Sequence, residues 1–386
     1  MRKIAVVTVA RSDYGIYRPL LRRLDERREL HPVLVVGGAH HVSGTGSTEQ
    51  EVEADGFEIA ARPRVDVDTG SGLGIARATG AWTSAFADAL AATGPDLVVV
   101  LGDRYEMQAA ALAALPLTLP VAHLHGGESS EGAFDEQLRH SITKLSHLHF
   151  PATELYGRRI VQMGEEPWRV TVAGAPGLDA IRELEPLSPE ELEREHGFRV
   201  REGLLLVTHH PETLAPDLLE THYRALFDAL DACGRPLVVT APNVDTGGAR
   251  ALELVEEFAA ARDDVVFVPS LGSRGYLSLL RHVDALVGNS SSGIIEAASF
   301  ELPVVNVGER QRGRVRGRNV IDTGAEAGEI LAGIRQALEP RFGDSLAGLA
   351  NPYGDGHASE RIAARLGEVG LGRELLVKRF RDLGSG

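Results

Sequence analysis

Short apolar runs alternate with longer stretches of helical pattern along the whole chain. The first series of runs covers Lys3 to Val9, Pro32 to Val36, Asp96 to Leu101, Pro120 to Leu124, and Arg169 to Val172. The second series covers Leu204 to Thr208, Pro236 to Thr240, Asp264 to Val268, Ala285 to Val287, and Pro303 to Val307. This alternation is typical of repeated βα units that build a parallel sheet. It predicts an α/β protein with two doubly wound parallel sheets.

The segment from Glu183 to Arg199 separates the two series. It contains Pro186, Pro189 and many charges, which is typical of a connection followed by the first helix of a new domain. The chain has 386 residues, and a single core usually serves roughly 150 to 200 residues. We therefore expect two domains with a boundary near residue 175, so that residues 1–175 form the first.

Composition is that of a folded, water-soluble protein, with 43% hydrophobic and 25% charged residues. No apolar stretch approaches the roughly 20 residues that a membrane helix needs. The apolar run after Met1 is too short for a signal peptide, because Arg11 and Asp13 interrupt it. Cys233 is the single cysteine, which excludes an intrachain disulfide and fits a reducing compartment. We expect a cytoplasmic protein that does not enter the membrane.

The net charge of -15 argues against a general nucleic-acid binder, whose phosphate contacts call for a basic field. An anionic ligand must therefore meet local positive groups. Only Lys3, Lys144 and Lys378 among the 40 basic residues are lysine, so arginine supplies nearly all of them. Coding bias is the simplest explanation of this preference. An arginine is therefore a candidate ligand-binding residue only where its position supports that role.

Ligands of open α/β sheets bind outside the carboxyl ends of the strands, so the residues after each apolar run are the candidates. Asp103 follows the run ending at Leu101 and precedes an alanine-rich helix that ends near Ala114. It could cap that helix, which is worth about 1 kcal/mol, or it could take part in catalysis. The sequence alone favours neither.

The next run ends in a cluster of ionisable residues, His123, His125 and Glu128, and Asp135 follows on a predicted helix. Strand alternation sends both histidines to the same side. A zinc site is one interpretation, but no complete ligand set can be assigned. We favour a cluster of carboxylates and histidines for acid/base chemistry, since crowding pushes their pKa values apart.

In the second half, two runs end in His209-His210 and in Pro242-Asn243, which would present polar groups toward one cleft. A third run leads into Gly288-Asn289-Ser290-Ser291-Ser292-Gly293, where backbone N–H groups and the helix dipole suit a diphosphate. Glu296, about one turn into that helix, could bind ribose hydroxyls. This turn lacks the lysine of a P-loop and the second glycine of a nucleophile elbow.

Two arginines follow strands at positions suited to phosphate. Arg310 is the first of five arginines at alternate positions, Arg310 to Arg318, and lies nearest its strand end. Arg11 follows the first strand. The forked guanidinium of arginine suits phosphate. For the other arginines of this stretch, the alternative is that they are solvated charges on a surface loop.

These motifs together resemble a known family, the hydrolysing UDP-N-acetylglucosamine 2-epimerases of sialic-acid and related nonulosonic-acid pathways. The similarity extends from Arg11-Ser12-Asp13-Tyr14-Gly15 to Asn319-Val320. Its most specific parts are Leu101-Gly102-Asp103-Arg104, the stretch His123 to Phe150, His210-Pro211, Pro242-Asn243, Gly288-Asn289-Ser290-Ser291, and Arg310-Gln311.

The resemblance implies a GT-B-like fold of two Rossmann-like domains facing a cleft, with UDP bound by the domain of residues 176–358. The last segment, 359–386, would carry a helix that returns to the first domain. The implied reaction eliminates UDP across C1 and C2 to give a 2-acetamidoglucal, which water converts to the free manno sugar. No metal or nicotinamide cofactor is expected, and the G-x-G-x-x-G fingerprint is missing. A dimer or tetramer is expected.

The resemblance also implies residue roles. Asp103 and Asp135 would handle the C2 proton and the acid steps, and His210 would stabilise the departing diphosphate. The expected substrate-binding residues are Arg11, Arg104, Arg139, Asn243, Val268, Ser290, Ser291, Ser292, Glu296 and Arg310. Some family members have a catalytic glutamate where this chain has His125, so either His125 or Glu128 takes over that proton transfer. The substrate is UDP-GlcNAc or its 2,4-diacetamido-trideoxy analogue, as used for legionaminic acid.

Three other functions remain open. A non-hydrolysing epimerase would keep UDP on its product. A GT-B glycosyltransferase would have a similar turn at Ser290 to Glu296 but would need an acceptor. A catalytically silent UDP-sugar sensor would not need the ionisable groups Asp103, His125, Glu128 and Asp135.

Overall fold

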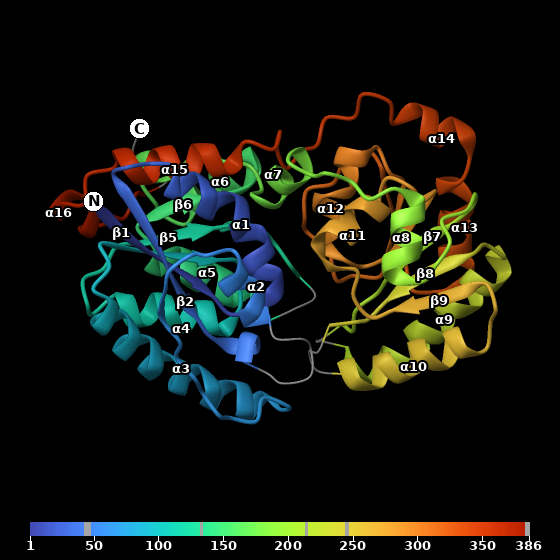
Figure 1. The fold of residues 1–386 in the computed structure, drawn as a ribbon, viewed down its shortest axis with the longest axis horizontal. Helices are drawn as coiled ribbons and strands as arrows, with labels where there is room; N and C mark the ends of the chain where they lie inside the picture. The colour runs from blue at the N-terminus through green and yellow to red at the C-terminus, as the bar shows by residue number, and fades with distance from the viewer. Residues whose placement is uncertain (42–47, 132–133, 213–214, 244–246, 383–386) are drawn as a thin grey trace. The chain divides into compact units, whose positions relative to one another are not determined.

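The computed structural model of the protein describes residues 1–386 except 42–47, 132–133, 213–214, 244–246 and 383–386 (Figure 1). The chain folds into two compact units. Unit 1 comprises Met1–Glu128, Asp135–Ala180 and Tyr353–Gly386, and unit 2 comprises Ser129–Phe134 and Ile181–Pro352. Each unit has its own sheet and its own hydrophobic core.

Unit 1 is built on a parallel six-stranded sheet. Its strands are β1 (Arg2–Thr8), β2 (Leu30–Val36), β3 (Ile59–Ala61), β4 (Leu97–Leu101), β5 (Val121–Leu124) and β6 (Leu148–Phe150). Their order is β3-β2-β1-β4-β5-β6, with every pair parallel. This is the doubly wound order, in which the strand order switches sides between β1 and β4. Ligands are expected at the carboxyl ends of these two strands.

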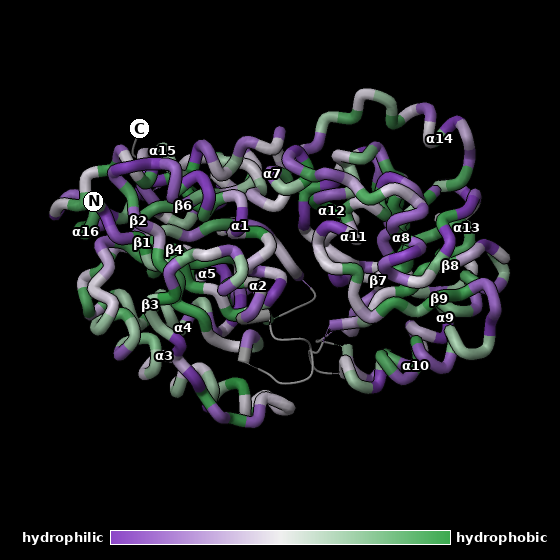
Figure 2. Tube along the Cα trace, viewed as in Figure 1, coloured by the Kyte–Doolittle hydropathy of each residue, from purple (hydrophilic) through white to green (hydrophobic). Residues whose placement is uncertain are grey.

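Helices cover both faces of this sheet, and apolar side chains of strands and helices meet in one core. They are α1 (Arg11–Asp25), α2 (Thr48–Ala54), α3 (Gly72–Thr93), α4 (Tyr105–Ala114), α5 (Asp135–Leu145), α6 (Glu154–Gln162), α15 (Ala358–Glu368) and α16 (Arg373–Leu376), with short 3₁₀ turns η1 (Gly38–His41) and η2 (Pro167–Arg169). Figure 2 shows hydrophobic colouring along β1, β2 and β4. Helix α15 packs against α1 although more than 300 residues separate them.

Unit 2 repeats the same architecture. Its strands are β7 (Leu205–Thr208), β8 (Leu237–Thr240), β9 (Val265–Val268), β10 (Ala285–Gly288), β11 (Val304–Val307) and β12 (Val320–Thr323), in the order β12-β11-β10-β7-β8-β9. Its helices are α8 (Pro189–His196), α9 (Leu219–Cys233), α10 (Gly248–Ala260), α11 (Gly272–Leu279), α12 (Ser291–Ile295), α13 (Ala327–Ala337) and α14 (Pro340–Ser345), with η3 (Pro216–Leu218) and η4 (Ala297–Phe300). Helix α7 (Gly177–Arg182) spans the limit between the units. The predicted fold class, two doubly wound parallel sheets, is confirmed.

Nine of the ten predicted strands are present with ends shifted by at most about two residues, and one is wrong. The segment Arg169 to Val172 is not a strand, because η2 begins at Pro167 and only Val170 forms an isolated bridge, to His149. The sequence pattern missed β3, β6 and β12. All three are edge strands of only three or four residues, too short to stand out as apolar runs.

Two buried side chains hold the C-terminal segment within unit 1. The carboxylate of Asp179 accepts hydrogen bonds from the backbone N–H groups of Ala358 (3.0 Å) and Ser359 (2.6 Å). It therefore satisfies the first turn of α15, whose own N-cap residue provides no side-chain hydrogen bond. Arg169 donates to three backbone carbonyls of this segment, those of Glu374, Leu375 and Val377, and also to the carbonyl of His147. Among the helices in the described part of the chain, none is long and apolar enough to cross a membrane.

Candidate active site

Asp103 lies just beyond the carboxyl end of β4, and a buried arginine holds its carboxylate. Arg139, from α5, donates to Asp103 and also to Glu136 (3.1 Å). The side chain of Arg139 is only 1% exposed, whereas that of Asp103 is 27% exposed. The N-cap residue of α4 is Arg104, without a side-chain capping bond, so helix capping is not the role of Asp103. The carboxylate of Asp103 is therefore held by Arg139 and stays partly exposed, so a ligand can reach it.

A second buried residue, His123 on β5, fixes the turn that carries Asp103. Its Nε2 lies 2.8 Å from the carbonyl oxygen of Gly102, and its Nδ1 lies 3.1 Å from Oγ1 of Thr143. A carbonyl can only accept, so the proton is on Nε2 and Thr143 donates to Nδ1. Burial lowers the pKa of His123 to about 3, which keeps the ring neutral. Gly102 has φ +70°, a backbone conformation that glycine adopts without strain.

His125 and Glu128 form a buried pair after β5. Nδ1 of His125 lies 2.6 Å from Oε1 of Glu128, while its Nε2 is buried and meets no hydrogen-bond partner among the described residues. His125 lies beyond the last strand residue and has φ 60°. The strand alternation that was expected to send it to the same side as His123 therefore does not govern it. The pair can pass a proton between carboxylate and imidazole.

Asp135 is the first residue of α5 and is partly exposed. Glu136 beside it accepts from Arg139 and from His140 (3.0 Å). The carboxylate of Glu136 therefore holds these two side chains in place. Sequence reasoning gave Glu136 no role. Its partners are three and four residues away on one helix face, a spacing that could have been read.

Asp13 and Glu106 are further acidic residues that the sequence analysis did not assign. Glu106 is 2% exposed and pairs with Arg104 (3.2 Å). The carboxylate of Asp13 accepts from the backbone N–H of Val9 (3.3 Å). Burial raises the pKa of Asp13 to about 6, although the charge of Arg104 opposes the shift. Arg11, the first residue of α1, is exposed.

In unit 2, the imidazole of His210 has a defined proton position. The backbone N–H of Asn243 donates to Nδ1 of His210 (3.1 Å), so the ring proton is on Nε2. Burial holds the pKa of His210 well below its usual value, and the charge of Arg310 contributes. His210 is therefore a neutral hydrogen-bond donor through Nε2, which suits an oxygen of a diphosphate.

The serine turn follows β10. Ser290 is the N-cap residue of α12, and its Oγ accepts from the N–H of Ser292 (3.3 Å). Helix α12 has only five residues, so the helix dipole that we expected there is weak, and backbone N–H groups with Arg310 must supply the positive field. A Cβ on Gly288 would lie 2.1 Å from the carbonyl oxygen of Thr208, so only glycine fits.

The structure links three of the predicted residues of unit 2 through one buried residue. His210, Arg310 and Ser290 meet through Asn289, whose backbone carbonyl accepts from Nη1 of Arg310 (3.1 Å). Val268 ends the edge strand β9, and Glu296 follows the last residue of α12. Ser291 and Ser292 form the first turn of α12.

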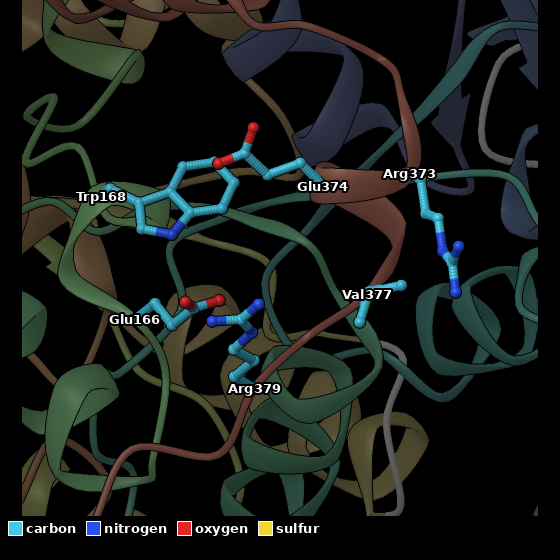
Figure 3. Close-up of a pocket in the computed structure, with 6 residues that line it drawn as sticks. All are labelled: Glu166, Trp168, Arg373, Glu374, Val377 and Arg379. Atoms are coloured by element: carbon cyan, nitrogen blue, oxygen red, sulfur yellow. The ribbon is translucent and has the colours of Figure 1, made fainter.

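Two cavities lined by described residues do not include the predicted residues. One, of about 410 Å³, is lined in unit 2 by residues that include Glu131, Glu212 and Glu309. The other, of about 440 Å³, lies in unit 1 between η2 and the C-terminal segment, where Figure 3 shows Trp168 and Arg373 among its lining residues. Acidic and basic groups are mixed there, and none of its lining residues follows a strand of the sheet. Hydrogen bonding at the strand ends therefore defines the candidate site better than cavity size does.

No group of three or more histidine, cysteine, aspartate or glutamate side chains in the described part of the chain is arranged to hold a metal ion.

Comparison with known proteins agrees with the fold and the motifs. The family model described as UDP-N-acetylglucosamine 2-epimerase matches residues 22–367. The chain is 39% identical to the UDP-N,N'-diacetylbacillosamine 2-epimerase (hydrolyzing) of Legionella pneumophila, over 98% of this chain and 99% of that protein. It is 35% identical to the polysialic acid biosynthesis protein P7 of Escherichia coli, over 92% and 90% of the two chains.

Among solved structures, the UDP-GlcNAc 2-epimerase of Neisseria meningitidis bound to UDP-GlcNAc superposes with a TM-score of 0.82 at 19% identity, over 94% of this chain and 99% of that one. This likeness extends over both units and agrees with a GT-B-like fold. Family match, relatives and fold lead to one assignment: the chain belongs to the UDP-N-acetylglucosamine 2-epimerase family.

Proposed function

We propose that the protein is a hydrolysing 2-epimerase, which converts a UDP-linked 2-acetamido sugar to the free manno-configured sugar and UDP. The observation that carries this proposal is the carboxylate of Asp103, held at the end of β4 by buried Arg139 and open to a ligand. Such a fixed carboxylate is suited to moving a proton at a carbon atom. The hydrolysing relatives support the same reaction.

The proposed reaction has two stages, an elimination and a hydration. In the first, a base removes the C2 proton, and the electron pair of the C2–H bond forms the C1=C2 double bond. The C1–O bond breaks at the same time, and UDP leaves with the electron pair of that C1–O bond. In the second, an acid adds a proton to C2 from the opposite face. The oxygen of water bonds to C1 and gives one of its two protons to a base, which leaves a hydroxyl at C1. The products are UDP and a 2-acetamido sugar inverted at C2.

The acid/base residues of unit 1 divide these steps. The resemblance implies that Asp103 and Asp135 together handle the C2 proton and the acid steps, and we assign the C2 proton to Asp103. The pair of His125 and Glu128 supplies the remaining proton transfer, with the hydrogen bond between them letting either member act. His210 donates from Nε2 to the departing diphosphate.

UDP binding is assigned to residues at strand ends or helix starts, because ligands of open α/β sheets bind outside the carboxyl ends of the strands. We assign this role to Arg11, Arg104, Asn243, Val268, Ser290, Ser291, Ser292, Glu296 and Arg310. Arg139 differs, because its guanidinium is buried and paired with Asp103 and Glu136. That position supports a role in holding Asp103 instead of contacting the sugar.

The names of the relatives favour the 2,4-diacetamido sugar as substrate. Two relatives named as hydrolysing carry diacetylbacillosamine in their names, one as the UDP sugar at 39% identity and one as the GDP/UDP sugar at 35%. Another relative, at 34%, is named UDP-N-acetylglucosamine 2-epimerase. A location in the cytoplasm and a dimeric or tetrameric assembly stay predictions.

Product analysis by proton NMR in deuterated water tests the function. UDP-GlcNAc and its 2,4-diacetamido-trideoxy analogue are offered separately to the purified protein. Free manno sugar with deuterium at C2, together with UDP, is expected, and the converted sugar identifies the substrate. A product that keeps UDP would indicate the non-hydrolysing reaction. UDP binding without conversion of either sugar would instead favour a glycosyltransferase or a sensor.

A further inference from the structure

We propose that Asn289 is a positioning residue, which holds His210 and Arg310 in place for the diphosphate; this inference rests on the proposed function. Asn289 is fully buried at the end of β10. Its Oδ1 accepts from the backbone N–H of His210 (2.7 Å), and its Nδ2 donates to the backbone carbonyl of the same residue (2.9 Å). Two hydrogen bonds from one side chain thus fix both polar groups of His210's backbone.

The backbone of Asn289 fixes the other side of the site. Its carbonyl oxygen accepts from Nη1 of Arg310 (3.1 Å) and from Nε2 of Gln311 (2.8 Å). Its N–H donates to the carbonyl oxygen of Thr208 (3.1 Å), which ties β10 to β7. One residue therefore joins the histidine, the arginine and the turn that begins at Ser290.

The chemistry of this position requires an amide. A carboxylate offers acceptors only, so it would leave the carbonyl of His210 without its donor, and an apolar residue would leave both backbone groups unsatisfied. A further hydrogen bond, from the backbone N–H of Asn243, orients the ring of His210. This bond forms only if the backbone of His210 is correctly placed. Displacement by about 1 Å costs on the order of a hundredfold in rate when a catalytic group is misplaced.

A matched pair of variants separates positioning from stability. Asn289→Ala is compared with Asn319→Ala, because Asn319 is also fully buried in unit 2 and its Nδ2 donates to the carbonyl of Leu302 (2.9 Å). Both variants are expected to lower Tm to a similar extent. Only Asn289→Ala is expected to lower kcat, by about tenfold to a hundredfold, and to weaken UDP binding. Should either alanine variant fail to fold, Asn289→Asp and Asn319→Asp replace the pair, since they keep the side-chain shape.

A double-mutant cycle with His210→Ala tests whether Asn289 acts through the histidine. The loss caused by Asn289→Ala is expected to shrink to within about twofold in the His210→Ala background. An equal loss in both backgrounds, or a loss matched by Asn319→Ala, would overturn the role of Asn289.

Nitrogen NMR of the imidazole provides a readout that does not depend on turnover. Wild-type His210 is expected to carry its proton on Nε2, and Asn289→Ala is expected to populate both tautomers. A wild-type protein that neither binds UDP nor converts either sugar would refute the proposed function, yet this spectrum would still test the inference. An unchanged spectrum in Asn289→Ala would refute the inference by itself.

Discussion

Two histidines with the same protonation state have different tasks. His123 and His210 are both buried, neutral and protonated on Nε2. His123 donates its N–H to the carbonyl of Gly102 and so fixes the backbone before Asp103. Nδ1 of His210 accepts from Asn243, so its N–H is on Nε2, the group that the proposed function directs to the diphosphate. The surrounding backbone, and not the residue type, distinguishes the histidine that positions a turn from the one that we propose to bind the ligand.

Replacing Asp103 by asparagine tests its role as the proton-transfer group. Asp103→Asn is expected to retain UDP binding and to lower kcat by about 10² to 10⁴, because the amide cannot accept a proton. Calorimetry with UDP and the NMR assay measure the two effects. Asp96→Asn is the matched control, since Asp96 precedes the same strand and only accepts from the backbone N–H of Lys3 (2.8 Å). Normal turnover in Asp103→Asn would remove Asp103 from the mechanism.

Ser290→Ala is expected to weaken UDP binding about fivefold, as the loss of one hydrogen bond of roughly 1 kcal/mol implies. It also removes a helix cap, so stability falls as well. Ser188→Ala is the control, because Ser188 caps α8 through the N–H of Glu191 (3.2 Å). Calorimetry that gives equal UDP affinity for both variants would exclude Ser290 from the site.

The sequence allowed prediction of the residues at strand ends but not of their partners. Asp103 and His210 follow apolar runs, and their placement depends only on local pattern. Asp13 was overlooked because the charges that surround it, such as Arg104, come from another strand end. Arg139 was expected to bind substrate, and no local pattern could reveal that its guanidinium would be buried under Asp103.

Among the elements, length and continuity of the apolar run decided what could be predicted. Strand β6 escaped prediction because His149 interrupts it between Leu148 and Phe150. Burial of this histidine is compensated by Glu165, whose Oε2 lies 3.1 Å from its Nε2. Glu165 in turn binds Lys144 and Lys378, one of them close to the C-terminus. A strand stabilised by partners so far apart in the chain leaves no local signal.

The cap of α15 by Asp179 provides a test of how the C-terminal segment is held. Asp179→Asn keeps one acceptor oxygen of two and loses the charge at the helix N-terminus, so about 1 to 2 kcal/mol of stability should be lost. Urea denaturation measures the loss, and amide exchange should rise in α15 first. Exposed Asp344→Asn is the control. Unchanged exchange in α15 would show that the cap contributes nothing.

At the scale of the whole molecule, both units use the same strand order and place their polar residues at the same edge of the sheet. Each core consists of the strands and the helices that cover them. This repetition explains why one rule, inspection of the residues after apolar runs, found candidates in both halves. Buried histidines are a second shared feature, and they make the stability of the molecule depend on pH.

Stability is expected to fall as pH decreases from about 6.5, the pKa of histidine in an unfolded chain. Burial lowers the pKa of His123 and His209 to about 3 and that of His147 to about 4. Below pH 6.5 the unfolded chain therefore binds protons that the folded protein does not, and each such histidine lowers the free energy of unfolding by at most about 1.4 kcal/mol per pH unit.

Asp13 acts in the opposite direction, because its pKa is raised to about 6 and its folded form gains a proton between about pH 6 and 4. Three histidines outweigh one carboxylate, so the net slope still favours unfolding in acid. Urea titrations at several pH values between about 5 and 8 measure it. His209→Gln should reduce the slope by about 1.4 kcal/mol per pH unit, whereas His357→Gln, at an exposed histidine, serves as the control. A slope that His209→Gln leaves unchanged would mean that His209 is protonated in the folded protein, and the neutral state inferred for its neighbour His210 would then need direct measurement by NMR.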